Sequence, residues 1–425
     1  MKESTRILIN AMVVHPNYGS EFGFPWFWII NLARYNFQID VITCVHEDNQ
    51  AVIEELLVQK RIENVTFHFI PFPPIWKIKL PFSPKYGTPI PYFHEMIKCW
   101  HWHYLSYQLG KQLIPAKQIQ IVHQLNTVGF RMPGFHFFHK IPIVWGPIGA
   151  GGRLHLKLLS HLNLRGRLFY IFHNSINFLQ WNFAPYINWC FYRADAIICS
   201  TKEMQRMTKR KLILSSNKIS YIPETGAVQN DLAKSPKTSS KSVLTIATAC
   251  YFMARKNLPL LFDALKSLES DEYVLNICGE GPAEDYFKTY ADQCGVKNIN
   301  WLGWLSKTET NKVIAAADIF VMPSLKEANS TVLFESFANA TPVIMLHVNG
   351  LKDTIKDGIN GYTIKPRWSR GKMVTALASH LSNMMKSHEL RHKLSKGALE
   401  TAHHHLYSKR IERLLPIYRQ VLGEK

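Results

Sequence analysis

Short apolar runs alternate with helical patterns along this chain in two successive series, and this alternation constrains the fold more than any other feature. The runs are rich in Val and Ile and too short to cross a membrane, as in RILINAMVV, IDVITCV and IPIVWG before residue 200 and VLTIATA, DIFVMPS and TPVIML after residue 242. Such runs, each followed by a helix, are typical of buried parallel strands. The sequence therefore predicts an α/β protein with two doubly wound, Rossmann-like domains.

A polar segment separates the two series. Residues 232–242, LAKSPKTSSKS, have the composition of a linker. We therefore predict a first domain over 1–235, a second over 236–406, and an amphipathic helix over 407–425. Open α/β sheets bind ligands beyond the carboxyl ends of their strands, so the functional residues are expected in the loops at those edges.

The charge of the chain indicates which class of partner it binds, and its cysteine content indicates the cellular compartment. The chain carries 50 Lys and Arg against 31 Asp and Glu, a net charge of +19, spread over its whole length. This balance suits a phosphate-rich partner, whether nucleotide, nucleic acid or anionic membrane. Seven cysteines without a C-x-x-C pair suggest neither disulfides nor a zinc ribbon, and neither a signal peptide nor a membrane-spanning run is evident. We expect a cytoplasmic protein.

The segment from Asp318 to Leu346 combines a strand end, two glutamates and a helix start. Asn329 or Ser330 can cap a helix beginning near Thr331, whose first amides would bind an anion. Glu335 would lie about 7 Å farther along that helix, roughly the distance from a diphosphate to a ribose. Glu327 would lie on the other side of the helix start. Two glutamates eight residues apart are usually a solvated helix face, but this setting favours a sugar-nucleotide site.

These residues resemble the retaining glycosyltransferases of family 4, which have the GT-B fold. The resemblance implies that Glu335 binds the nucleotide ribose and that Glu327 contacts the donor sugar. The diphosphate would meet the amides of Asn329, Ser330, Thr331 and Val332. The family's C-terminal helix returns to the first domain, as expected here for 407–425. Ala328 and Ala340 replace two glycines of the family pattern, which leaves a catalytically impaired relative as an alternative.

Three further loops extend the resemblance to other parts of the chain. Lys256 matches the family lysine that neutralises the leaving diphosphate, and Arg255 is expected to replace the family arginine from a neighbouring position. Gly281 lies in the G-x-G-P wall beside the nucleotide, although this is also a common turn. Gly19 and Ser20 match the glycine loop that closes over the diphosphate, with an ordinary turn as the alternative.

The first half adds weaker candidates. His123 is a candidate for the family histidine that contacts the donor sugar, but an alignment with Leu125 and a role in the core are alternatives. The phrase WGPIGAGG resembles a polysaccharide-building subgroup, and its glycines, Gly149, Gly151 and Gly152, can admit sugar hydroxyls near the backbone.

Aromatic and basic side chains intermix in residues 70–106 and 153–183. Such tracts suit a headgroup interface, and they also suit core helices with solvated lysines. With the resemblance, they suggest a lipid-linked or oligosaccharide acceptor and peripheral attachment to the inner face of an anionic plasma membrane.

The leading hypothesis is a glycosyltransferase that uses a nucleoside diphosphate sugar and retains configuration in cell-surface polysaccharide or lipopolysaccharide assembly. The proposed catalytic residues are Glu327, Lys256, Arg255 and His123, with no metal and no cofactor. A nucleic-acid-binding protein would explain the charge but lacks a matching motif. An oxidoreductase is disfavoured because the first strand lacks a G-x-G-x-x-G loop. The sequence leaves the donor sugar, its base and the acceptor open.

Overall fold

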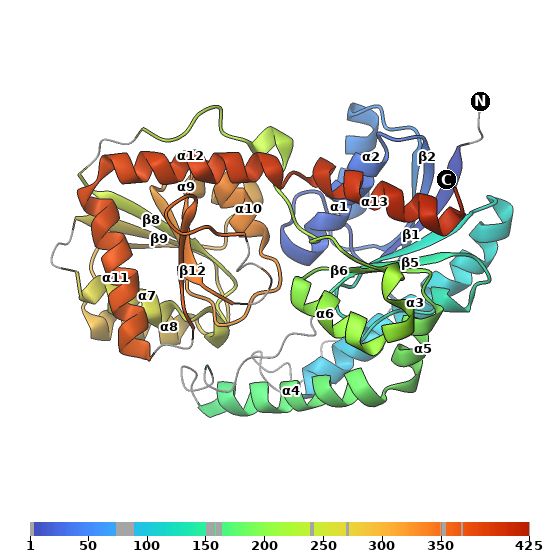
Figure 1. The fold of residues 1–425 in the computed structure, drawn as a ribbon, viewed down its shortest axis with the longest axis horizontal. Helices are drawn as coiled ribbons and strands as arrows, with labels where there is room; N and C mark the ends of the chain where they lie inside the picture. The colour runs from blue at the N-terminus through green and yellow to red at the C-terminus, as the bar shows by residue number, and fades with distance from the viewer. Residues whose placement is uncertain are drawn as a thin grey trace. The chain divides into compact units, whose positions relative to one another are not determined.

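The computed structural model describes residues 4–73, 89–149, 158, 164–238, 242–268, 272–348, 350, 354–366 and 369–424, with backbone alone for 89–93, 165 and 214. Its contacts divide the chain into two compact units, and Figure 1 labels many of their helices and strands. Unit 1 comprises Met1–Arg153, His173–Glu224 and Tyr407–Lys425. Unit 2 comprises Leu154–Phe172 and Thr225–Leu406.

Unit 1 contains a parallel sheet in the order β3-β2-β1-β4-β5-β6-β7. Its strands are β1 Thr5–Ala11, β2 Phe37–Cys44, β3 Val65–Ile70, β4 Ile121–Asn126, β5 Ile143–Ile148, β6 Ala196–Cys199 and β7 Ile219–Tyr221. Its helices include α1 Ser20–Leu32, α2 Asn49–Gln59, α3 Pro89–Ala116, α5 Pro185–Arg193 and α6 Lys202–Lys211. The central strands are buried along their length, as expected for a parallel sheet covered on both faces.

Unit 2 contains a second parallel sheet in the order β10-β9-β8-β11-β12-β13. Its strands are β8 Leu244–Ala249, β9 Tyr273–Cys278, β10 Ile299–Gly303, β11 Ile319–Met322, β12 Val343–Leu346 and β13 Gly361–Ile364. Its helices include α7 Leu258–Lys266, α8 Glu284–Cys294, α9 Lys307–Ala316, α10 Thr331–Ala338, α11 Arg370–Lys386 and α12 His388–His404. The strand order reverses between β8 and β11, which is where such sheets bind ligands. The predicted pair of Rossmann-like domains is confirmed.

The last helix, α13 (Tyr407–Leu422), belongs to unit 1 although it follows unit 2 in the chain. The Tyr407 ring stacks on Phe27 of α1 with 4.9 Å between ring centroids. Tyr418 meets Phe37 edge to face. These apolar contacts bury one face of the helix, which explains the amphipathic spacing of residues 407–425. They also confirm that the helix returns to the first domain.

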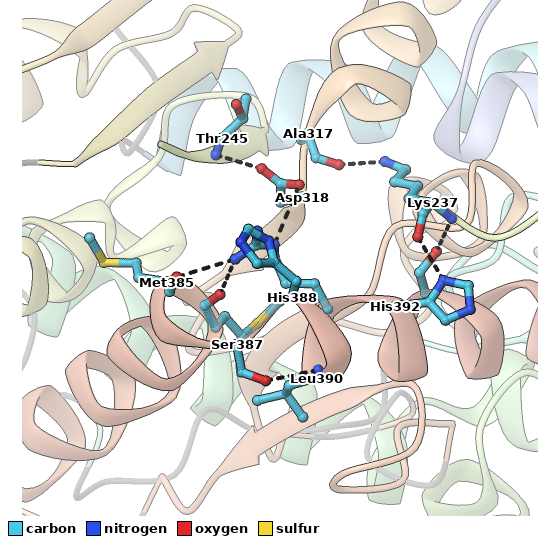
Figure 2. Close-up of polar contacts among 12 residues, drawn as sticks. Lys237, Thr245, Ala317, Asp318, Met385, Ser387, His388, Leu390 and His392 are labelled. Carbon is cyan, nitrogen blue, oxygen red and sulfur yellow. Dashed lines mark hydrogen bonds and ion pairs between the residues drawn. The ribbon is translucent and has the colours of Figure 1, made fainter. Parts of the chain in front are cut away.

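The segment predicted as a linker is anchored within unit 2. The Lys237 ammonium donates to the Ala317 carbonyl, as Figure 2 shows. It also donates to the Ile314 carbonyl and, at 2.6 Å, to the Thr341 hydroxyl. The Lys237 amide donates to Ser395 Oγ of α12 at 2.7 Å. The division between the units accordingly falls at residues 224 and 225, before the expected boundary at 235, and unit 2 also takes in Leu154–Phe172. The polar composition of this segment suggested a linker. Composition does not reveal that acceptors far away in the chain bind Lys237.

Ala340, where the family pattern has glycine, is fully buried with a φ of +52°. A Cβ in this left-handed region costs roughly 1–2 kcal/mol, which exceeds the extra chain entropy that a glycine loses on folding. We therefore expect Ala340→Gly to raise the free energy of unfolding by about 0.5–1 kcal/mol. Denaturant titration measures this, with Ala338→Gly, a buried position inside α10, as the control that should lower stability. A loss of stability in Ala340→Gly would contradict the strain.

Candidate active site

The loops after β8 and β11 meet at the switch point of the unit 2 sheet. The Leu325 amide donates to the Arg255 carbonyl at 2.8 Å, and Asn257 Nδ2 donates to the Pro323 carbonyl at 3.3 Å. Asn257 has a φ of +53°, a left-handed turn that leads from the 3-10 turn Ala254–Lys256 into α7. These bonds hold the basic pair of one loop against the acidic residue of the other.

An ionic cluster joins the two loops. Lys256 Nζ lies 2.6 Å from Glu327 Oε1, and Arg255 Nη1 lies 3.4 Å from the same oxygen. Arg255 Nη1 also donates to the Lys326 carbonyl at 2.8 Å. Burial favours the neutral acid, but Lys256 and Arg255 outweigh it and lower the pKa of Glu327. The structure thus brings together three of the four predicted catalytic residues, around a carboxylate that stays ionised.

The helix α10 begins beside this cluster. Ser330 is its N-cap residue, in extended backbone conformation, and its side chain makes no capping hydrogen bond. Thr331 is buried and Val332 partly buried, while Asn329 and Ser330 lie partly exposed. A helix start without a side-chain cap directs amides and the positive end of the helix dipole outward, an arrangement suited to an anion.

Glu335 is buried within α10, and its environment is unusual for a carboxylate. Its exposed fraction is 7%, and among the residues that the structure describes its Oε1 has no hydrogen-bond partner. Burial raises the pKa of Glu335 to about 7, with Lys307 lowering it and Asp231 raising it. A buried acceptor without a donor is costly, so a group that brings hydroxyl donors would find an unused site here.

Gly281 adjoins the loop that follows β8. A Cβ at Gly281 would lie 2.8 Å from both the amide nitrogen and the carbonyl oxygen of Phe252, and φ there is +147°. Ala283 N donates to the Phe252 carbonyl, and Phe252 N donates to that of Glu280. The predicted G-x-G wall therefore packs backbone to backbone against the segment leading to Arg255, and glycine is required at this close approach.

The predicted glycine loop belongs to unit 1. Gly19 is the N-cap of α1, and a Cβ there would meet nothing within 4 Å. Ser20 has a φ of +55°. A Cβ at Gly23 would lie 1.9 Å from the Tyr18 carbonyl oxygen, so this loop turns too tightly for another residue. Gly149 approaches Ser200, while Gly151 and Gly152 lie outside the described residues.

His123, the fourth predicted catalytic residue, belongs to unit 1 and is buried there. Its side chain is buried on β4, its Nδ1 lies 2.6 Å from the Tyr418 hydroxyl and its Nε2 lies 2.6 Å from the Gly146 carbonyl. Burial lowers the pKa of His123 to about 4, with the Gly146 bond acting against that shift. Both ring nitrogens are engaged in the core, which favours the core alternative over contact with a donor sugar.

Tyr170 was missed by the sequence reasoning. It is buried in the core of unit 2, to which its segment Leu154–Phe172 belongs. Burial raises the pKa of Tyr170 to about 12, and its ring is near enough for Arg255 and Glu327 to contribute electrostatically. No periodicity near residue 170 predicts this proximity, because Arg255 lies about 85 residues farther along the chain.

A possible metal site was also not predicted. His15, Glu47 and Asp48 of unit 1 place one ligand atom each within 4.8 Å of the others. However, His15 Nδ1 accepts from the Asn17 amide at 3.2 Å, so its Nε2 carries the proton that Asp48 accepts at 2.9 Å. Neither ring nitrogen presents a free lone pair, and the residues present do not fit an ion.

Known proteins resemble this chain in both sequence and fold. Residues 232–401 match the family described as Glycosyl transferases group 1. An uncharacterized glycosyltransferase of Methanocaldococcus jannaschii is 32% identical over 129 residues, 30% of this chain and 32% of its own. The lipopolysaccharide core biosynthesis glycosyltransferase LpsE of Rhizobium meliloti is 27% identical over 217 residues, 50% of this chain and 60% of its own. The chain thus spans about a third to three fifths of these two relatives.

Solved structures share the fold over nearly the whole chain. WaaG, a glycosyltransferase involved in lipopolysaccharide biosynthesis, superposes with a TM-score of 0.64 at 16% identity, covering 97% of this chain and 99% of its own. Anabaena HepE in complex with UDP gives a TM-score of 0.60 at 12% identity, covering 98% and 100%.

The fold and the match together define the class. The chain has the two-domain GT-B fold. The ionic cluster and α10 lie within residues 232–401, the part of the chain that matches the glycosyl transferases group 1.

Proposed function

We propose that this protein transfers a sugar from a nucleoside diphosphate sugar to an acceptor hydroxyl. The observation that carries the proposal is the arrangement at one switch point of unit 2. It combines a buried Lys256–Glu327 ion pair, an α10 start without a side-chain cap, and a Glu335 carboxylate whose Oε1 has no hydrogen-bond partner among the described residues. A donor of this kind needs three binding groups in order: cations for its diphosphate, a polar group for its sugar, and a hydrogen-bond acceptor for its ribose. HepE was crystallised with UDP, which supports a uridine donor.

The proposed chemistry relies on the departing diphosphate. Lys256 and Arg255 would stabilise the charge that grows on its leaving oxygen, together with the amides that begin α10. Glu327 would orient both cations and accept from a donor-sugar hydroxyl. The leaving oxygen would take the acceptor proton on the same face of the sugar, so the configuration would be retained. We propose that no metal is required, because these cations and amides supply the positive charge.

The acceptor and biological role follow from different observations. LpsE and WaaG are named for lipopolysaccharide synthesis, which favours a role in cell-surface polysaccharide assembly. No helix among the described residues is long and apolar enough to cross a bilayer. We propose a lipid-linked acceptor met at the inner, anionic face of the plasma membrane.

A catalytically impaired relative is the second candidate, suggested by Ala328 in place of a family glycine. The structure disfavours it at this position because Ala328 is exposed. The test is release of nucleoside diphosphate from a panel of UDP-, GDP- and ADP-sugars, with and without a bacterial lipid extract and with EDTA. We expect one donor to be turned over, faster with extract and unaffected by EDTA. Binding of a donor without any release would support the impaired relative.

The pKa of Glu335 makes donor affinity depend on pH. Ribose hydroxyls that donate to this carboxylate favour its ionised form, so binding below about pH 7 must expel a proton. We expect affinity for UDP-glucose to rise with pH, by up to about tenfold per unit below pH 7, and to level off above it. Calorimetric titrations from about pH 5.5 to about pH 8.5 measure this, since the diphosphate diester stays ionised. Glu335→Gln should give a flat profile, and a flat wild-type profile would contradict the assignment.

A further inference from the structure

Unit 1 carries a surface cluster of aromatic side chains from three neighbouring elements. These elements are α3, the 3-10 turn His136–Phe138 with the residue before it, and α5. α3 and α5 lie side by side (Figure 1), and the ring centroids of Trp100 and Tyr186 are 5.8 Å apart. Six residues form what we call the aromatic platform: Tyr104, Phe135, Phe138, Tyr186, Trp189 and Tyr192.

The rings at the centre of the platform are nearly parallel. Those of Phe135, Tyr186 and Trp189 are tilted by only 18–30° from the Phe138 ring, with centroids 5.0–6.4 Å from it. Four of the six platform side chains are exposed, by 38–63% of their surface. A contiguous set of exposed aromatic rings marks an interaction surface.

Hydrogen bonds behind the platform hold it in place. The Tyr186 hydroxyl donates to the Gly134 carbonyl. Arg193 Nη2, at the end of α5, donates to the carbonyls of His139 and Ile141 at 2.7 and 3.0 Å. These bonds fix α5 against the chain that follows the 3-10 turn. The platform is therefore preorganised, which lowers the entropic cost of binding a ligand.

The surrounding sequence is basic. Residues 96–153 and 173–194 of unit 1 contain seven Lys and Arg and no Asp or Glu. Asp195, directly after the second range, lies 3.1 Å from Arg193 and offsets part of this charge. The excess of cations favours an anionic ligand. It disfavours a second copy of the chain on the platform, because like charges would meet.

Two lysines place their ammonium groups beside the platform. Lys111 Nζ lies 5.8 Å from the ring centroid of Tyr107, which follows Tyr104 by about one turn of α3. Lys218 Nζ donates to the Tyr192 carbonyl at 2.8 Å. These ammonium groups are placed to pair with carboxylates or phosphates of a ligand that stacks on the rings.

An acidic sugar chain matches this combination of rings and cations. A sugar ring has C–H groups on its faces and hydroxyls around its edge, and C–H groups interact favourably with the electron-rich face of an aromatic ring. The hydroxyls of Tyr104 and Tyr192 and the indole N–H of Trp189 would bond to the sugar hydroxyls. Acyl chains offer these polar groups no partner, so the platform favours a saccharide over a bilayer.

We propose that the aromatic platform binds an acidic oligosaccharide, by stacking of its sugar rings and by pairing of its anionic groups with the neighbouring lysines. The inference deepens the proposed function, because it rests on a role in polysaccharide assembly and names the chemistry of the acceptor chain. Unit 1 alone would supply these contacts, which do not involve the donor site.

Calorimetric titration of the full chain without donor tests the proposal. The probe is oligogalacturonate, with dextran oligosaccharides as neutral sugars and polyglutamate as an acidic chain without sugar rings. The wild type should bind oligogalacturonate about tenfold more tightly than either of the other two chains. Phe138→Ala/Trp189→Ala should bind it at least about fivefold more weakly. Tyr286→Ala is the matched control, since this 44% exposed ring belongs to α8 of unit 2.

The double variant should keep the wild-type affinity for UDP-glucose, so this test can fail without affecting the proposed transferase activity. If truncation of Trp189 lowers the melting temperature, Tyr192→Ala, at the most exposed ring, should still weaken oligogalacturonate binding. Equal binding by the wild type and these variants would overturn the proposal. So would polyglutamate bound as tightly as oligogalacturonate, or no oligogalacturonate binding at about 10 mM. Flotation with phosphatidylglycerol vesicles that the double variant abolishes would assign the platform to a membrane instead.

Discussion

Replacing Lys256 with methionine is expected to lower kcat by roughly 10²–10³-fold while donor affinity falls much less. The Lys256 side chain is 12% exposed and lies 2.6 Å from Glu327, so it acts in a site with little solvent screening. Its charge matters most when the diphosphate departs, because the negative charge on the leaving oxygen grows in the transition state. Steady-state turnover together with calorimetric donor binding measures the two effects separately.

Two further variants secure the interpretation of Lys256. Lys288→Met removes an exposed lysine of α8, 2.8 Å from Glu284, and should leave turnover unchanged. In Lys256→Met, the buried Glu327 carboxylate would pair with Arg255 alone. The double variant Lys256→Met/Glu327→Gln also removes the charge of that carboxylate, so it should restore stability without restoring kcat. An equal loss of kcat and affinity in Lys256→Met would indicate uniform binding, and unchanged kcat would remove Lys256 from the mechanism.

Replacing Glu335 with alanine is expected to weaken donor binding by about 1–3 kcal/mol, roughly 5- to 150-fold. The reason is the loss of charge-assisted hydrogen bonds from the ribose. Glu335 is buried and its Oε1 has no hydrogen-bond partner among the described residues. No hydrogen bond of this oxygen therefore stabilises the fold there. Calorimetry with UDP and with the preferred donor measures the loss.

Stability distinguishes this role from a structural one. Glu335→Gln keeps the side-chain volume and removes a buried acid, so its melting temperature should equal or exceed that of the wild type while donor affinity falls. Such a gain at the expense of binding is typical of a residue retained for function. A destabilised Glu335→Gln variant with unchanged affinity for UDP would show that the carboxylate supports α10 instead.

Local patterns predicted the features that neighbouring residues determine. The strand end before Ser324, the helix starting at Thr331 and the position of Glu335 inside it follow from spacing over about a dozen residues. The two parallel sheets follow from repeated apolar runs for the same reason. Helical and strand periodicity are local properties, so a single chain reveals them.

Contacts between distant residues escaped prediction. The Glu327 oxygen pairs with Lys256 across 71 residues, and no spacing rule connects the two loops. Lys237 lies in a segment of linker composition, yet its ammonium donates to three acceptors, in α9 and just before β11 and β12. His123 looked catalytic by resemblance, whereas the Tyr418 hydroxyl, 295 residues away, fixes it in the core. Tertiary packing decides each of these, and composition does not report it.

Hydrogen exchange of the full chain with and without a bound UDP-sugar tests the central claim most directly, because it locates the donor. The account predicts protection in residues 250–257, 279–283 and 327–336 of unit 2, with little change around Lys237 and residues 314–318 at the opposite edge of the same sheet. Loss of that protection in Glu335→Ala would agree with it. Protection confined to other segments, or none at a concentration that saturates binding, would contradict the placement of the donor at the β8–β11 switch point.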